Sequence, residues 1–166
     1  METLPIFVRR ATREDEATIV GFNAEMALET EGRALDRGRL EAGTRAVFAG
    51  SGRGFYLVAE RAGAVVGCLL ITREWSDWRN GWFWWIQSVY VVPSARRGGI
   101  YRALYQWLEA TAPSGDPDGD GAPVVGMRLY VDKENVKAMA TYEALGMIRA
   151  HYQLYEVDFV LGAATR

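Results

Sequence analysis

Apolar and polar positions follow two different periods along the chain, and the changes of period divide it into elements. Short apolar runs bounded by Gly, Pro or Asn indicate strands, whereas apolar residues three and four positions apart indicate helices. The predicted strands are 6–10, 55–60, 65–72, 82–92, 124–131 and 153–160. The predicted helices run from about 12 to 29, over a weaker stretch that ends near the turn at 50–52, from 100 to 111, and from 135 to 145.

The order of these elements favours one mixed α/β domain, which we expect to span residues 1–166. Arg61-Ala62-Gly63 is a short link between two apolar runs, so it predicts a hairpin. The run 65–71 is apolar on both faces, which predicts a central strand covered from two sides. Asn80-Gly81 tolerates the positive φ of a second tight turn. A meander of strands therefore comes first, and crossover helices follow.

The segment from residue 89 to 104 is the most informative, because a strand leads through a glycine loop into a helix. The helix is predicted to start directly after Arg96-Arg97-Gly98-Gly99. A helix N-terminus offers unpaired N–H groups, and two glycines let the backbone approach an anion closely. Arg102 adds a third cation. These features predict a cradle for a pyrophosphate, without the Lys-Ser/Thr pair that a nucleoside triphosphatase loop requires.

Composition narrows the possible chemistry. The 166 residues include 19 Lys and Arg against 21 Asp and Glu, and this balance argues against general binding to nucleic acid. Cys68 and His151 are each alone, which excludes a disulfide framework and the usual Cys or multi-His metal sites, so no metal is expected. No apolar run is long enough to span a membrane. We expect a cytoplasmic protein that does not bind membranes.

Two segments together resemble a known family. Val89–Pro93 followed by Arg96–Leu104 resembles the coenzyme A motif of the GNAT N-acetyltransferase superfamily. Leu129–Val131 and the residues Asn135, Ala138, Tyr142 and Leu145-Gly146-Met147 resemble its second motif. The resemblance implies a central, mostly antiparallel, twisted sheet of six to seven strands flanked by about four helices and splayed at the strand that carries Val89 to Val92.

The resemblance also implies roles for individual residues. It implies that the backbone of Val89 to Val91 pairs with the pantetheine arm of acetyl coenzyme A and that the amides from Arg97 to Arg102 hold its pyrophosphate. The implied cofactor-binding set is Val89, Tyr90, Val91, Arg96, Arg97, Gly98, Gly99, Ile100, Tyr101, Arg102, Asn135 and Tyr142. Tyr101 departs from the family pattern, which has Gly or Ala at that position.

Two members of this set have a structural alternative. Tyr142 would place its hydroxyl near the thioester sulfur and protonate the departing thiolate, or it is a packed aromatic residue. Asn135 would contact the pantetheine arm, or it serves as a helix N-cap, and both roles are compatible.

The acceptor side is less well defined, because the strand 82–87 contains no carboxylate. Glu29, Glu31, Glu74 and Asp77 lie in segments that border the acceptor side in such a fold. Of these, Glu29 and Glu74 are the first candidates for a general base, against the alternative of ordinary surface carboxylates. The candidate acceptor-binding residues are Glu29, Trp75, Trp78, Trp85 and Gln87. The alternative for the tryptophans is packing within the sheet and its hairpin.

The resemblance implies an N-acetyltransferase that moves an acetyl group from acetyl coenzyme A to a primary amine of a small molecule or peptide. The amine would attack directly in a ternary complex, with no covalent enzyme intermediate. One alternative is a non-catalytic sensor of coenzyme A or acyl coenzyme A, and another is an interaction module without a ligand. A homodimer is possible. Asp116, Asp118 and Asp120 resemble the opening of a calcium loop, but Met127 replaces the final Glu, which favours a solvated acidic loop.

Overall fold

The computed structural model describes residues 4–50, 52–116, 118 and 120–161. Ser51 of the predicted turn and the two ends of the predicted domain, 1–3 and 162–166, lie outside these ranges. The chain divides into two compact units, one that ends at Tyr130 and one that begins at Val131. The first unit holds β1 (Ile6–Arg10), α1 (Glu16–Glu31), α2 (Arg37–Phe48), β2 (Phe55–Arg61), β3 (Ala64–Ser76), β4 (Gly81–Val91), α3 (Ile100–Thr111) and β5 (Val124–Leu129). The second holds α4 (Val136–Ala144).

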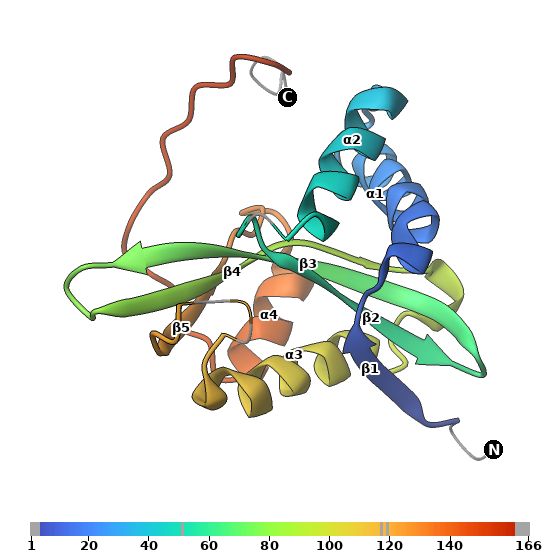
Figure 1. Cartoon of the computed structure of the whole chain (residues 1–166). Coiled ribbons are helices and arrows are strands. Elements are labelled where there is room, and N and C mark those ends of the chain that lie inside the picture. Colours follow the sequence, from blue (N-terminus) through green and yellow to red (C-terminus); the bar gives the residue numbers. More distant parts are fainter. Residues whose placement is uncertain (1–3, 51, 117, 119, 162–166) are drawn as a thin grey trace. The chain divides into compact units, whose positions relative to one another are not determined.

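The strands of the first unit form one sheet in the order β1-β2-β3-β4-β5 (Figure 1). The first four pair antiparallel, and β5 pairs parallel with β4. A parallel return requires a crossover connection, which α3 supplies. The predicted hairpin is confirmed, because Ala62 and Gly63 have φ values of 53° and 76°, as a two-residue turn of the primed type needs. Asn80 has φ 49° in the second predicted turn.

Helices cover both faces of this sheet. In Figure 1, α1 and α2 lie on one face and α3 lies on the other. The five residues Phe55–Ala59 of β2 are therefore all buried, although their side chains alternate between the faces. Leu104 and Leu108 are fully buried on one stripe of α3, and the central position predicted for residues 65–71 is confirmed by β3. No helix of the described residues is long and apolar enough to cross a membrane.

The strand count differs from the prediction of six to seven, because the described residues contain five. The strand expected at 153–160 is absent, and this segment has no regular secondary structure. Tyr155 and Phe159 within it are about 90% exposed. Alternating apolar residues suit a strand, but a strand also requires a hydrogen-bonded neighbour, which the local pattern does not identify.

The acidic loop after α3 is only partly solvated, which corrects the sequence-based prediction. The side chain of Asp116 is completely buried, and that of Arg73 on β3 is 6% exposed. Arg73 donates to both carboxylate oxygens of Asp116, and Trp84 Nε1 donates to Oδ2 at 2.9 Å. Burial alone would raise the pKa of Asp116, but these donors hold the pKa below its ordinary value. A buried ion pair thus fastens the loop to the α3 face of the sheet.

Candidate active site

Strands β4 and β5 separate partway along their length. The last pair in their ladder joins Ile86 to Leu129. The pairing of β4 with β3 continues beyond this point, as far as Val91 and Gly67. Among the described residues, the part of β4 after Ile86 therefore has no strand on its β5 side. This fork lies beside residues 89–92, the part of the strand where the sheet was predicted to splay.

The open edge of β4 presents alternate backbone groups. The N–H of Val92 donates to Val66 O on β3 at 3.0 Å. Because successive residues of a strand point their N–H groups to opposite sides, Tyr90 also faces β3, whereas Val89 and Val91 face the open side. The carbonyl of Val91 accepts from Arg96 Nε at 2.8 Å. Val89 therefore offers both its N–H and its C=O at the open edge.

The glycine loop follows directly, between a short turn (Pro93–Ala95) and α3. Arg97 and Gly99 have φ values of 60° and 81°. Turns with left-handed residues can aim backbone N–H groups at an anion. Within this loop the N–H of Gly98 donates to Ala95 O at 3.2 Å. Gly99 also caps α3, whose first N–H groups have no partner within the helix. A Cβ atom at Gly98 would lie 2.6 Å from Arg61 Nη1 and 2.9 Å from Ala95 O, so this position requires glycine.

Tyr101, which departs from the family pattern, lies in the first turn of α3. Its ring centroid is 6.2 Å from that of Tyr105, one helical turn further on. The two rings therefore lie on the same face of α3.

Two carboxylates of α1 meet β4 and the glycine loop. The hydroxyl of Tyr90 is 2.5 Å from Glu25 Oε2 and 3.2 Å from Glu29 Oε1. Burial and these carboxylates raise the pKa of Tyr90, so its phenol stays protonated. Arg96 Nη2 donates to Glu29 Oε2 at 2.6 Å. The structure thus joins the predicted residues Glu29, Tyr90 and Arg96 in one network.

A second network forms where β3, β4 and β5 run side by side. The carboxylate of Glu74 accepts from Trp85 Nε1 and, at 2.6 Å, from Arg128 Nη1. The ring of Trp85 is 4.5 Å from the ring of Tyr130, which follows the last paired residue of β5. Glu74 remains 43% exposed. The network therefore places an accessible carboxylate and an aromatic surface beside the fork.

Gln87 lies near the same network. Its Nε2 donates to Thr72 Oγ1 at 2.9 Å. Alternation along β3 puts Thr72 and Glu74 on the face of Cys68, which packs in the core cluster that includes Ile19 of α1. Three of the predicted catalytic or acceptor residues, Glu74, Trp85 and Gln87, are therefore associated on the α1 face.

Trp75 and Trp78 are not part of this network. Trp75 follows Glu74 along β3 and so points to the opposite face, where its ring lies 4.9 Å from that of Trp82. Trp78 lies in the turn between β3 and β4 and is 87% exposed. The structure separates these two tryptophans from Trp85.

The remaining predicted residues belong to the second unit. Asn135 accepts at Oδ1 from the N–H of Ala138 at 3.1 Å, so it is an N-cap of α4. Its contact with a cofactor stays a prediction. Tyr142, on α4, is half-buried, and burial raises the pKa of its hydroxyl. Its phenol is therefore protonated at neutral pH, as a proton donor must be.

Sequence reasoning missed three charged residues of these networks: Glu25, Arg61 and Arg128. Glu25 lies four residues before Glu29, and residues at this spacing share one helix face, so this signal was available. Arg61 reaches the carbonyl of Gly98, and Arg128 reaches Glu74. Both contacts depend on strand register, which leaves no local signal in the sequence.

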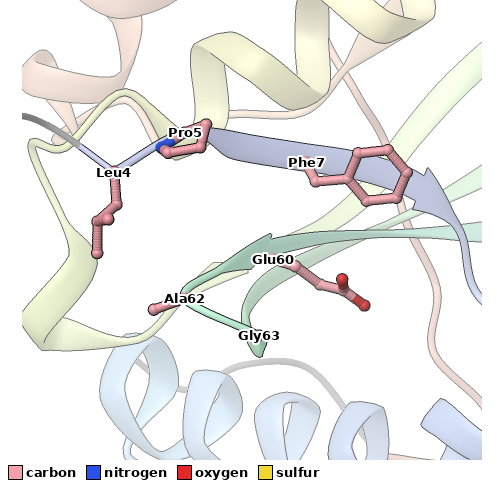
Figure 2. Close-up of a pocket in the computed structure, with 6 residues that line it drawn as sticks. All are labelled: Leu4, Pro5, Phe7, Glu60, Ala62 and Gly63. Atoms are coloured by element: carbon pink, nitrogen blue, oxygen red, sulfur yellow. The ribbon is translucent and has the colours of Figure 1, made fainter.

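A shallow hollow of about 320 Å³ lies elsewhere on the first unit. Figure 2 shows its lining, which is Leu4, Pro5, Phe7, Glu60, Ala62 and Gly63. These residues belong to the N-terminal segment and to the hairpin of β2 and β3, and none was predicted as a site residue. The hollow is open and holds no cluster of reactive groups, so we place the active site at the fork instead.

Solved structures share this fold. A possible acetyltransferase from Clostridium difficile 630 is 42% identical, with a TM-score of 0.81 over 93% of this chain and 98% of that one. A ribosomal-protein-alanine N-acetyltransferase from Brucella melitensis biovar Abortus 2308 is 15% identical, with a TM-score of 0.70 over 93% and 100% of the two chains. The aminoglycoside N-acetyltransferase AAC(6')-Iy, in complex with CoA, is 11% identical, with a TM-score of 0.69 over 96% and 98%.

The last two structures show likeness of fold alone. No protein of curated function gives a significant match. The sequence model of the acetyltransferase (GNAT) family matches residues 23–147, which include the fork, the glycine loop and α4. The chain therefore belongs to the acetyltransferase (GNAT) family, and it is an acyltransferase.

Proposed function

We propose that this enzyme transfers an acetyl group from acetyl coenzyme A to a primary amine of a small molecule or peptide. The observation that carries the proposal is that the open edge of β4 at Val89 leads along the chain into the glycine loop and the N-terminus of α3. The amides of a pantetheine arm would pair with Val89 as an added strand does. The pyrophosphate would accept from N–H groups of residues 97 and 99–102, beside the cations of Arg97 and Arg102, whereas the N–H of Gly98 donates to Ala95 O.

We infer that both compact units contribute to one acetyltransferase domain, because the family match runs across Tyr130. In this arrangement Asn135 contacts the pantetheine arm and Tyr142 approaches the sulfur. No metal takes part in the proposed reaction, and nucleic acid and membranes are not proposed partners. A homodimer stays a prediction.

The chemistry requires few groups of the protein. Acetyl coenzyme A supplies an activated thioester carbonyl, which the amine attacks directly in the ternary complex. An N–H on the open side of β4 that does not pair with the pantetheine arm would donate to the oxyanion that forms. Tyr142 would protonate the thiolate that leaves. The carboxylate of Glu29 or Glu74 would take a proton from the ammonium of the acceptor, directly or through water.

The acceptor is expected to lie on the α1 face of the fork. Trp85 and Gln87 would contact it there, because both lie beside Glu74. Trp85 can hold an ammonium or an apolar group by cation–π and stacking contacts. Trp75 and Trp78 would meet only those acceptors that extend past the edge of this face.

Calorimetric titration with coenzyme A tests the proposed cofactor site. We expect saturable binding to the wild type and a Kd at least about tenfold higher for Arg97→Glu, since the reversed charge repels the pyrophosphate. Arg37→Glu, a change of the same kind on exposed α2, serves as the control and should bind as the wild type does. A wild type that does not bind millimolar coenzyme A contradicts the proposal and favours an interaction module. Binding without turnover of any amine favours a sensor.

The pH dependence of kcat tests the two candidate bases. We expect Glu29→Gln or Glu74→Gln to remove the acidic limb of the profile and to lower kcat by roughly 10²- to 10⁴-fold. Glu41→Gln on α2, where the native carboxylate pairs with Arg37, should leave the profile unchanged. If the acidic limb persists in both Glu29→Gln and Glu74→Gln, neither carboxylate is the base and water takes the proton.

A further inference from the structure

Arg61 connects the sheet to the glycine loop. Its Nη2 donates to the carbonyl oxygen of Gly98. Arg61 is the last residue of β2, and it pairs with Ile6 of β1 and Ala64 of β3. The tight turn at 62–63 follows at once. The guanidinium therefore approaches the loop from a rigid part of the sheet.

The loop requires such support because its conformation is strained. Arg97 adopts φ 60°, which is unfavourable for a residue with a Cβ atom. Within the turn, the N–H of Gly98 donates to Ala95 O at 3.2 Å, and the N–H of Arg96 donates to Pro93 O at 3.3 Å. Strained backbone persists only where its surroundings hold it. The hydrogen bond from Arg61 fixes the Gly98–Gly99 peptide, which comes directly after the strained residue Arg97.

The direction of that peptide has a consequence for anion binding. In a planar trans peptide, the C=O of Gly98 and the N–H of Gly99 point in opposite directions. The donor on Arg61 holds this C=O toward β2, so the N–H of Gly99 points away from β2. A hydrogen bond from a cation to the carbonyl also polarises the peptide and makes its N–H a stronger donor.

Arg61 has a further feature that stability alone does not explain. Its Nε is buried and has no hydrogen-bond partner among the described residues. A buried donor without an acceptor lowers the stability of the folded state. An apolar side chain at this position would avoid that cost, but it could not hold the carbonyl of Gly98.

We propose that Arg61 is a positioning residue for the pyrophosphate of the cofactor. It acts through the Gly98–Gly99 peptide, which it aims and polarises, and it does not touch the acceptor or the thioester. This inference rests on the proposed use of coenzyme A. The inference gives Arg61, at the end of β2, a role in cofactor affinity, although Arg61 lies outside the two sequence motifs.

The test compares Arg61→Met with the wild type in two binding experiments. Met keeps the apolar stem and removes the donor. We expect a Kd for coenzyme A roughly tenfold higher by calorimetry, as for the loss of one charged hydrogen bond. For pantetheine, which lacks the pyrophosphate, an NMR titration should give the same Kd as the wild type within about twofold. Arg61→Lys, which can still donate to Gly98, should restore part of the affinity.

A matched control and a kinetic measurement complete the test. Arg37→Met removes the same charge from exposed α2 and should bind both ligands as the wild type does. In turnover, Arg61→Met should raise KM for acetyl coenzyme A and leave KM for the acceptor unchanged. An unchanged Kd for coenzyme A overturns the inference. An equal loss for pantetheine and coenzyme A also overturns it, since Arg61 then maintains only the fold. If the wild type itself does not bind coenzyme A, the proposed function fails instead.

Discussion

Tyr142→Phe is expected to lower kcat by roughly 10²- to 10⁴-fold while the Kd for coenzyme A stays within about twofold of the wild type. The change keeps the ring and removes only the hydroxyl that would protonate the thiolate. Burial raises the pKa of Tyr142, so the wild-type hydroxyl remains protonated through the neutral range. Steady-state kinetics at saturating acetyl coenzyme A, with calorimetry on the same variant, separate loss of chemistry from loss of binding.

The pH profile gives a second check on Tyr142. Because its pKa lies above the ordinary value near 10, ionisation of this group should not lower kcat between about pH 7 and 9. Tyr155→Phe is a suitable control, since the native side chain is 89% exposed and lies outside α4. An unchanged kcat in Tyr142→Phe would assign thiolate protonation to solvent and would reduce Tyr142 to a packing residue.

The features that sequence predicted well are local ones. A strand, a tight turn and a capped helix each depend on residues within one short segment. Gly63 and Asn80 show this, because their tolerance of positive φ is a property of the residues themselves. The helix that begins after Gly99 was predicted from the spacing of its apolar residues, and it begins at Ile100.

The features that sequence did not predict depend on which residues meet across the sheet. The register of β3 and β4 shifts between Leu70 and Ile71, so Trp85 lies on the same face as Tyr90, although alternation along β4 alone would place them on opposite faces. Trp85 consequently joins Glu74, whereas Trp75 lies on the other face. The same limit applies to Arg61, whose contact with Gly98 spans 37 positions.

The burial of Asp116 is another long-range feature, and its removal should have a large effect on stability. Asp116→Ala leaves the Arg73 guanidinium, which is 6% exposed, without its buried partner. Breaking a buried pair in this way costs roughly 3–5 kcal/mol in the free energy of unfolding. The same change lowers Tm by about 10 °C in a chain of this size. Thermal and urea unfolding, monitored by circular dichroism, measure both quantities.

Two further variants, Asp118→Asn and Asp116→Asn, test whether the loss of stability comes from the buried charge. Asp118 is 53% exposed, pairs with Arg10 at the surface and lies 3.9 Å from Arg73 Nη2, the limit of an ion pair, so its neutralisation should cost less than about 1 kcal/mol. The folded-state pKa of Asp116 lies below the ordinary value near 4, so its stabilisation is complete above that pH and is lost as the pH falls through the lower, folded-state value. The stability difference between wild type and Asp116→Asn should therefore shrink below about pH 4. A difference that is small at pH 7, or that does not change with pH, would show that the Arg73 pair contributes little and that apolar packing around Trp84 holds the loop.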